Sequence, residues 1–264
     1  MKNNLSLQQA KCRDEAQKVL KEFFVGSPDE IDLHAIALNS CRLRIRFGNL
    51  DSAEGRLIAR PSGGGTIRIS DRLSPGRSRF TIAHEIGHYR MHSYVMSIDG
   101  DMELNAWSGE SREVEANIFA AELLMPEFLF SADLKAKAPN WGLVKVLSEK
   151  YKTSKIASAI QIIEYTKEPC VLACSSKGAM RWFRTSDSFR ENHFFFRRER
   201  ELHKFSDAYD ICAGNNNSVA GKGSRIPADA WLEGDGFDRN SYVLEDSCKI
   251  GDDVYSIIFI EDDI

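Results

Sequence analysis

The segment His84-Glu85-Ile86-Gly87-His88 combines the side chains that metal-assisted hydrolysis requires. On an α-helix, residues four positions apart lie about 6 Å from each other on one face. His84 and His88 can therefore bind one metal ion, while the carboxylate of Glu85 reaches a water molecule on that ion. Zinc lowers the pKa of its bound water to about 7, and a carboxylate can take and return the proton. The spacing predicts a zinc site that carries out hydrolysis.

This spacing has chemical meaning only on a helix, and the flanking sequence favours one. The apolar residues Phe80, Ala83 and Gly87 recur at helical spacing, and no proline lies between positions 77 and 94. The alternative is an exposed helix whose two histidines match the pattern by chance, because five-residue matches also occur at random.

A catalytic zinc site needs three protein ligands and an open position for water. His92 extends the histidine series, but along a straight helix His84 and His92 would lie about 12 Å apart. We therefore expect His92 to lie on the pocket wall or the surface, and the third ligand to come from another element.

An acidic helix predicted over residues 111–126 offers that ligand, because its apolar residues recur at helical spacing and Pro126 marks its end. Glu113 and Asn117 are four positions apart, so one can bind the metal while the other orients a ligand histidine. Each acid on this stretch can also belong to an ordinary solvated helix face, and Glu115 is expected to point elsewhere around the helix. Three acids are rivals for the ligand position: Glu110, Glu115 and Glu122.

The two blocks, H-E-I-G-H and E-x-x-A-N-x-F-A-A-x-L-L-M-P, together resemble the ImmA/IrrE family of intracellular metallopeptidases. The resemblance implies Zn²⁺ ligands at His84, His88 and Glu113, with Glu85 as the general base and Asn117 beside the site. It also implies a gluzincin-like core, in which the glutamate ligand comes from a second helix. The implied substrate is a protein, typically a helix-turn-helix transcriptional repressor that is cleaved in a stress, prophage or mobile-element response.

The rest of the first half is compatible with such a core. Apolar and polar residues alternate over 41–47, and strand-like runs follow at 54–60 and 66–70, which predicts a small sheet beside the motif helix. An exposed edge of this sheet can hold an extended peptide by strand addition. The Gly63-Gly64-Gly65 run favours a hairpin turn over a phosphate loop, because it lacks the lysine and the following helix.

The predicted fold class is α+β. After the core, a helical segment contains two helices joined by a short turn, which resembles a helix-turn-helix that could bind DNA. Packing that supports the core is the favoured alternative, because the second helix is poor in basic residues. Beyond it, short β-rich runs predict a C-terminal α+β domain of unknown role. The predicted boundaries are 1–126 for the core, 127–166 for the helical segment and 167–264 for the C-terminal domain.

Composition favours a cytoplasmic enzyme. The net charge of −4, from 39 acidic and 35 basic residues, argues against direct binding of nucleic acid. No apolar run comes close to the length of about 20 residues that a membrane-spanning helix needs. The first residues lack the apolar stretch of a signal peptide. The six cysteines have neither a zinc-binding spacing nor the density of a disulfide scaffold, which indicates reduced thiols.

We therefore expect a cytoplasmic zinc endopeptidase that hydrolyses peptide bonds. The main alternative is a regulator that keeps the fold but binds DNA or a repressor without cutting it. A purely structural zinc site is disfavoured, because it would leave Glu85 without a role. The group that stabilises the developing oxyanion is not identified by the sequence; Tyr89, His92 and Tyr94 are candidates by proximity alone.

Overall fold

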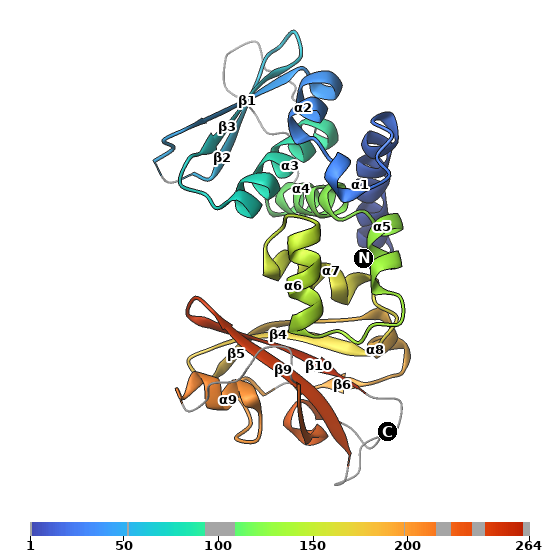
Figure 1. Ribbon diagram of the computed structural model, residues 1–264, viewed down its shortest axis with the longest axis vertical. Helices are drawn as coiled ribbons and strands as arrows, with labels where there is room; N and C mark the ends of the chain where they lie inside the picture. Colours follow the sequence, from blue (N-terminus) through green and yellow to red (C-terminus); the bar gives the residue numbers. More distant parts are fainter. Residues whose placement is uncertain are drawn as a thin grey trace. The chain divides into compact units, whose positions relative to one another are not determined.

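The computed structural model describes residues 2–51, 53–92, 109–197, 199–214, 223–233 and 241–260. The chain forms two compact units, Met1–Leu129 with Lys150–Ser154, and Phe130–Glu149 with Lys155–Ile264. Helices and a small sheet make up the first unit and a β-rich region dominates the second, so the predicted α+β class is confirmed (Figure 1). The three-part division at 126 and 166 stays a prediction.

The first unit contains a small sheet in the order β1-β3-β2, with β3 parallel to β1 and antiparallel to β2. The three strands confirm the runs expected from the alternating pattern. The first unit's helices lie along the sheet and beneath it (Figure 1). Its elements are α1 (Lys2–Glu22), a short 3-10 helix (Pro28–Glu30), α2 (Leu33–Cys41), β1 (Leu43–Gly48), β2 (Gly55–Ala59), β3 (Gly65–Ser70), α3 (Pro75–Met91) and α4 (Gly109–Leu124). Helix α5 (Glu127–Leu134) contains the boundary between the two units.

The three consecutive glycines form the hairpin turn between β2 and β3. Gly63, Gly64 and Gly65 all have positive φ angles, of 85°, 73° and 153°, which residues with a side chain rarely adopt. The hydroxyl of Tyr89 accepts a hydrogen bond from the backbone N–H of Gly64 at 2.8 Å. This bond connects the hairpin turn to the motif helix α3, so the phosphate-loop alternative is not supported.

Helix α3 carries the motif and packs closely against α4. Ile82, Ala83 and Ile86 are buried on its inner face. A Cβ atom at Gly87 would lie 3.0 Å from the Phe119 ring and 3.2 Å from the carbonyl oxygen of Ala116 on α4. Glycine at this position therefore allows the two helices to approach, and that approach brings the ligand candidates of both helices together.

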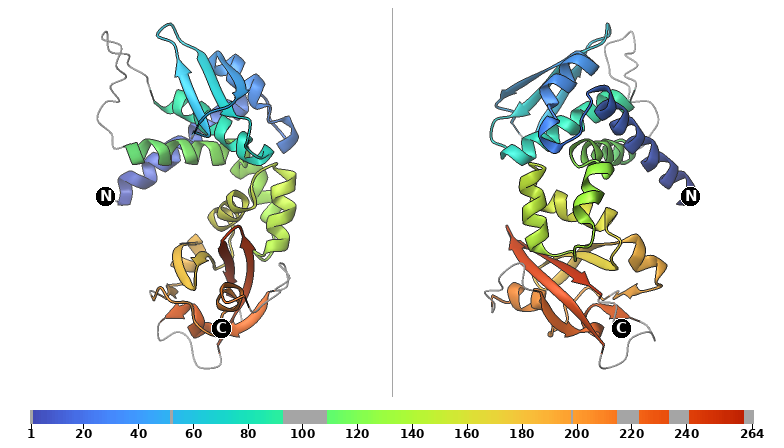
Figure 2. Two further views of the ribbon diagram at one scale, coloured as in Figure 1. Left: turned by 90° about the vertical axis from the view of Figure 1, so that its left-hand side faces the viewer. Right: turned by 45° about the vertical axis from the view of Figure 1, so that its right-hand side comes forward.

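Helix α1 lies alongside α4 (Figure 2). Buried acids of α4 accept hydrogen bonds from side chains of α1. Gln8 donates to Glu115, and Gln17 donates to the Oε1 atom of Glu122 at 2.9 Å. Both glutamates are buried, and each therefore has an amide donor on the neighbouring helix that offsets part of the cost of burial.

The second unit contains an antiparallel sheet in the order β5-β4-β10-β9-β7. Apolar residues of β4 alternate between the two faces of this sheet, which is consistent with layers on both sides. Its elements are α6 (Trp141–Lys150), α7 (Lys155–Tyr165), β4 (Cys170–Ser176), β5 (Ala179–Thr185), α8 (Asp187–Glu191), β6 (Phe195–Phe196), α9 (Asp207–Cys212), β7 (Ser224–Pro227), a 3-10 helix (Ala228–Ala230), β8 (Leu232–Glu233), β9 (Tyr242–Ile250) and β10 (Asp253–Phe259).

Helices α6 and α7 of the helix-turn-helix-like segment belong to the same unit as this sheet. The backbone N–H of Trp141 donates to Asp246 on β9 at 2.7 Å, and its indole N–H donates to the carbonyl oxygen of Tyr255 on β10 at 3.2 Å. Ile162 and Ile163 of α7 are also buried. These contacts support the packing interpretation of the two helices rather than DNA binding.

Within the described ranges, every helix is too short or too polar to cross a membrane. All six cysteines are free, and Cys12, Cys41, Cys170 and Cys174 are buried.

A buried carboxylate connects several elements of the second unit. Glu245 on β9 is fully buried; its Oε1 atom accepts hydrogen bonds from Ala208 N (2.8 Å) and Ser247 Oγ (2.7 Å). Its Oε2 atom accepts from Asp207 N (3.1 Å) and Trp231 Nε1 (2.7 Å). Burial raises the pKa of Glu245 to about 7, while the hydrogen bonds from Trp231, Ser247 and Ala208 act in the opposite direction. Glu245 thereby holds the start of α9 and the Trp231 segment against the sheet.

Replacing Glu245 with glutamine is expected to lower the free energy of unfolding by about 2 kcal/mol or more. Each carboxylate oxygen of Glu245 accepts hydrogen bonds from two donors, and the amide NH₂ group of glutamine would face two of these donors instead. An unsatisfied buried donor costs about 1–3 kcal/mol. Urea unfolding followed by tryptophan fluorescence measures the change. The exposed Glu191→Gln serves as the control, and an equal stability of the two variants would contradict this role for Glu245.

Candidate metal centre

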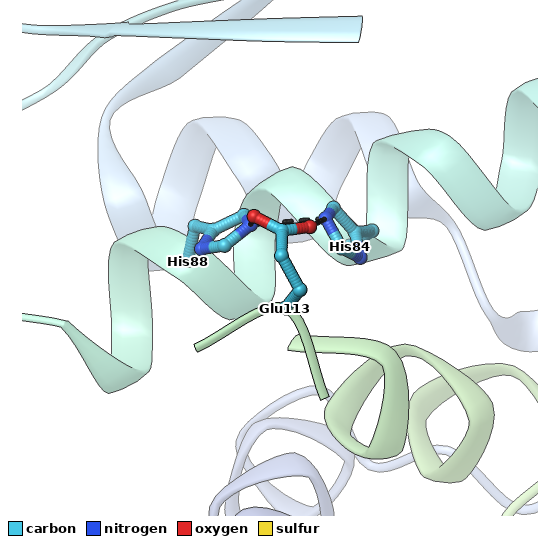
Figure 3. A group of neighbouring side chains, drawn as sticks. All are labelled: His84, His88 and Glu113. Carbon is cyan, nitrogen blue, oxygen red and sulfur yellow. Dashed lines mark hydrogen bonds and ion pairs between the residues drawn. The ribbon is translucent and has the colours of Figure 1, made fainter. Parts of the chain in front are cut away.

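Three side chains from two helices converge on one point. His84 and His88 project from the same face of α3, and Glu113 approaches from α4 with its carboxylate between the two imidazole rings (Figure 3). The Nε2 atoms of the two histidines lie 2.9 Å apart. The Glu113 oxygens lie 3.1 Å from His84 Nε2 and 3.2 Å from His88 Nε2. The structure thus brings together the three ligands that the sequence motifs imply.

The arrangement fits a divalent metal ion with nitrogen and oxygen ligands. Ligand atoms about 2.0–2.1 Å from a tetrahedrally coordinated zinc ion lie about 3.3 Å from one another, and the three separations here are close to that value. Burial is the largest cause that lowers the pKa of both histidines, to about 4 for His88, so both rings are neutral and their lone pairs are available. The Glu113 side chain is 59 % exposed, which leaves one side of the centre open to solvent and substrate.

The outer nitrogens of both ligand histidines have hydrogen-bond partners. His84 Nδ1 lies 2.9 Å from the Oδ1 atom of Asn117, as expected for a residue that orients a ligand ring. His88 Nδ1 lies 3.1 Å from His92 Nδ1. His92 is therefore placed behind the ligands rather than among them. Because each outer nitrogen is engaged, the Nε2 atoms are the ones that face the metal position.

Glu85 is buried between α3 and β2. Its carboxylate accepts a hydrogen bond from the backbone N–H of Leu57 on β2. Burial, followed by the negative charge of Glu113, raises the pKa of Glu85 to about 7. A carboxylate with a pKa near the working pH can both accept and return a proton, which is what a general base needs.

Gly55 on β2 provides the space that Glu85 occupies. A Cβ atom at Gly55 would lie 2.9 Å from the Oε1 atom of Glu85 and 2.5 Å from the side chain of Thr81. The sequence motifs did not identify Gly55 or Leu57 as parts of the site. One sequence carries no local signal for them, because their role depends on how β2 crosses α3.

The other residues considered from the sequence lie elsewhere. The Tyr89 hydroxyl is bound to the hairpin turn, and His92 faces Glu115, so neither is aimed at the metal position. Tyr94 and the side chain of Glu110 lie outside the described residues. Glu122 is buried against Gln17 and is not a ligand candidate.

The fold and the centre define a domain of metallopeptidase type: two histidines four positions apart on one helix, a glutamate from a second helix, and a small sheet alongside. Residues 40–161 match the family model of the IrrE N-terminal-like domain. The resemblance to the ImmA/IrrE family is therefore confirmed for this part of the chain.

Two known proteins are similar in sequence to the chain. The radiation response metalloprotease IrrE of Deinococcus radiodurans is 27% identical over 181 residues, which cover 66% of this chain and 51% of that protein. The chain thus matches about half the length of this relative. An uncharacterized immunity region protein of Bacillus phage phi105 is 26% identical over 119 residues, 44% of this chain and 68% of the phage protein.

A solved structure shares the fold. The chain resembles a Mycobacterium tuberculosis transcriptional regulator with a TM-score of 0.62 and 14% sequence identity, over 96% of this chain and 76% of that one. At this identity the likeness concerns the fold alone. It extends over both units of the chain, so the arrangement of elements within each is not peculiar to this sequence.

Proposed function

We propose that the protein is a zinc-dependent endopeptidase. The observation that carries the proposal is the convergence of His84, His88 and Glu113 beside a buried glutamate, Glu85, whose carboxylate is held by β2. A structural zinc site would use four protein ligands and has no need of a base next to it. Three ligands with one open side and an adjacent base are the requirements of hydrolysis.

The chain's own residues account for the proton transfers. His84, His88 and Glu113 would hold Zn²⁺, which supplies an acidified water molecule and a positive charge near the scissile carbonyl. Glu85 accepts the proton of the attacking water and then donates it to the leaving nitrogen. Its burial keeps bulk water away from the carboxylate, and the N–H of Leu57 fixes the orientation of that carboxylate.

The edge strand β2 is the proposed position of the substrate backbone. β2 pairs with β3 on one side only, and the described part of the sheet leaves its other side unpaired. Because Glu85 contacts Leu57 of this strand, a peptide added to the free edge of β2 would lie near the base. The Ile58 side chain is 48 % exposed and can contact such a peptide.

The proposed substrate is a helix-turn-helix transcriptional repressor in the cytoplasm, where such repressors act. Support comes from the resemblance to the ImmA/IrrE family and from the relatives, which are named for a radiation response and for a phage immunity region. Cleavage of the repressor would release the genes of a stress, prophage or mobile-element response.

Metal removal tests this function. The purified protein is expected to contain one Zn²⁺ per chain, to cleave a repressor encoded beside its gene, to lose cleavage after dialysis against a chelator, and to regain it on addition of Zn²⁺. Cleavage is followed by mass spectrometry of the repressor. His34→Ala, which removes an exposed histidine on α2, is the matched control and should bind metal and cleave normally.

The alternative function is regulation without cleavage. It would be supported if the zinc-loaded protein bound the repressor or its DNA operator tightly and left the repressor chain intact. The presence of the buried base Glu85 favours the peptidase, because binding alone gives this residue no role.

A further inference from the structure

We propose that His92 and Glu115 are positioning residues for the ligand His88, and that Gln8 on α1 completes their chain of contacts. The proposal rests on the metal centre described above. Each step of the chain is a contact between side chains: His88 Nδ1 lies 3.1 Å from His92 Nδ1, and His92 Nε2 lies 2.9 Å from the Oε2 atom of Glu115. The amide of Gln8 then donates to the Oε1 atom of Glu115.

The side chains in this series of contacts are shielded from water. The side chains of His88, His92 and Glu115 are 15%, 10% and 10% exposed. A polar contact that water cannot replace has a larger energetic effect than the same contact on the surface. The hydrogen bonds among these three side chains are therefore expected to have such a larger effect.

The positions of the hydrogens on His88 and His92 follow from which nitrogen of His88 binds the metal. If His88 offers the lone pair of Nε2 to a metal ion, its Nδ1 carries the hydrogen and donates it to His92 Nδ1. A neutral His92 then carries its own hydrogen on Nε2 and donates it to Glu115. The opposite tautomer of His92 would place two N–H groups against each other at 3.1 Å and a lone pair against the carboxylate at 2.9 Å. Glu115 therefore selects the tautomer of His92, and His92 selects that of His88.

The two ligand histidines are thus oriented by different means. The amide oxygen of Asn117 accepts from His84, whereas a carboxylate acting through a second imidazole holds His88. Carboxylate–histidine–metal chains raise the basicity of the ligand ring, and loss of such outer partners typically weakens metal binding by about 10–100-fold. Helix α1 takes part because Gln8 holds the carboxylate of Glu115 in place.

The α1–α4 interface supplies a matched control. Gln17 on α1 donates to Glu122 on α4 at 2.9 Å, as Gln8 does to Glu115, but this second pair makes no described contact with a ligand histidine. Removing either glutamine breaks an amide–carboxylate hydrogen bond between the same two helices. Only the loss of Gln8 is expected to lower the affinity for the metal.

The experiment measures Zn²⁺ affinity by competition with a chromophoric chelator, using full-length variants. His92→Leu and Glu115→Leu are expected to weaken Zn²⁺ binding by about 10–100-fold. Glu115→Gln should restore most of the loss, because its amide oxygen still accepts from His92. Gln8→Leu should weaken binding measurably and Gln17→Leu should leave it unchanged. Equal affinities of wild type and His92→Leu, or equal effects of the two glutamine variants, would overturn the proposal.

NMR of the imidazole nitrogens in the zinc-loaded wild type provides a second measurement that does not depend on how well the variants fold. The hydrogen of His92 is expected on Nε2, and a hydrogen on Nδ1 would overturn the proposal. If the wild type binds Zn²⁺ and cleaves, and His92→Leu has the same Zn²⁺ affinity, only the proposed positioning role is wrong. If the wild type binds no metal, the proposed peptidase function is wrong as well.

Discussion

Replacing Glu85 with glutamine is expected to lower kcat/KM for peptide hydrolysis by about 10²–10⁴-fold while the protein still binds one Zn²⁺. The amide has the shape of the carboxylate and keeps an oxygen that accepts the N–H of Leu57. It cannot take a proton from water, so the transfer step loses its base. Because Glu85 is not one of the three converging ligand side chains, metal affinity should be preserved.

The control for this variant is Glu54→Gln. Glu54 precedes Gly55 at the start of β2 and forms an exposed ion pair with Arg77 on α3, so it lies in the same region without contacting the base. Exposed pairs of this kind contribute about 0.2–1 kcal/mol, and the variant should cleave at the wild-type rate. If Glu85→Gln cleaves the repressor as fast as Glu54→Gln, Glu85 is not the general base.

The convergence of His84 and His88 was predictable from the sequence because its geometry is mostly local. Two histidines four residues apart meet on any helix, and the apolar pattern around them identifies the helix. The prediction of Glu113 as the third ligand required the second motif block and the family resemblance. The distance of Glu113 from the histidines depends on the crossing of α3 and α4, which a single sequence does not specify.

The surroundings of the ligands were harder to predict, because they come from elements distant in the chain. Gly55 and Leu57 lie on a strand that precedes the motif, and only the fold places them over Glu85. The rise of a straight helix predicted that His92 lies apart from the ligand candidates, and the three converging side chains do not include it. Its contact with Glu115 depends on the packing of α3 against α4, so the sequence pattern assigned it no partner.

Substitution of Gly87 by valine is expected to weaken Zn²⁺ binding strongly and to lower the free energy of unfolding by about 1–3 kcal/mol. Even a Cβ atom here would lie 3.2 Å from the backbone oxygen of Ala116 and 3.0 Å from the Phe119 ring, and valine adds two more carbons. Backbone atoms of α4 cannot rotate away as a side chain can. The two helices must therefore separate, and α4 would carry Glu113 away from His84 and His88.

Two measurements distinguish this effect from general loss of stability: urea unfolding of the metal-free protein, and Zn²⁺ affinity under conditions where the variant remains folded. Gly26→Ala is the control, because a Cβ atom there would lie 3.6 Å from the nearest atom, in ordinary contact. Valine at position 87 with unchanged Zn²⁺ affinity would show that the separation of α3 and α4 does not set the position of Glu113. Reduced affinity in a folded variant would mean that metal binding needs glycine at position 87, since the absence of a side chain there determines how closely the third ligand approaches.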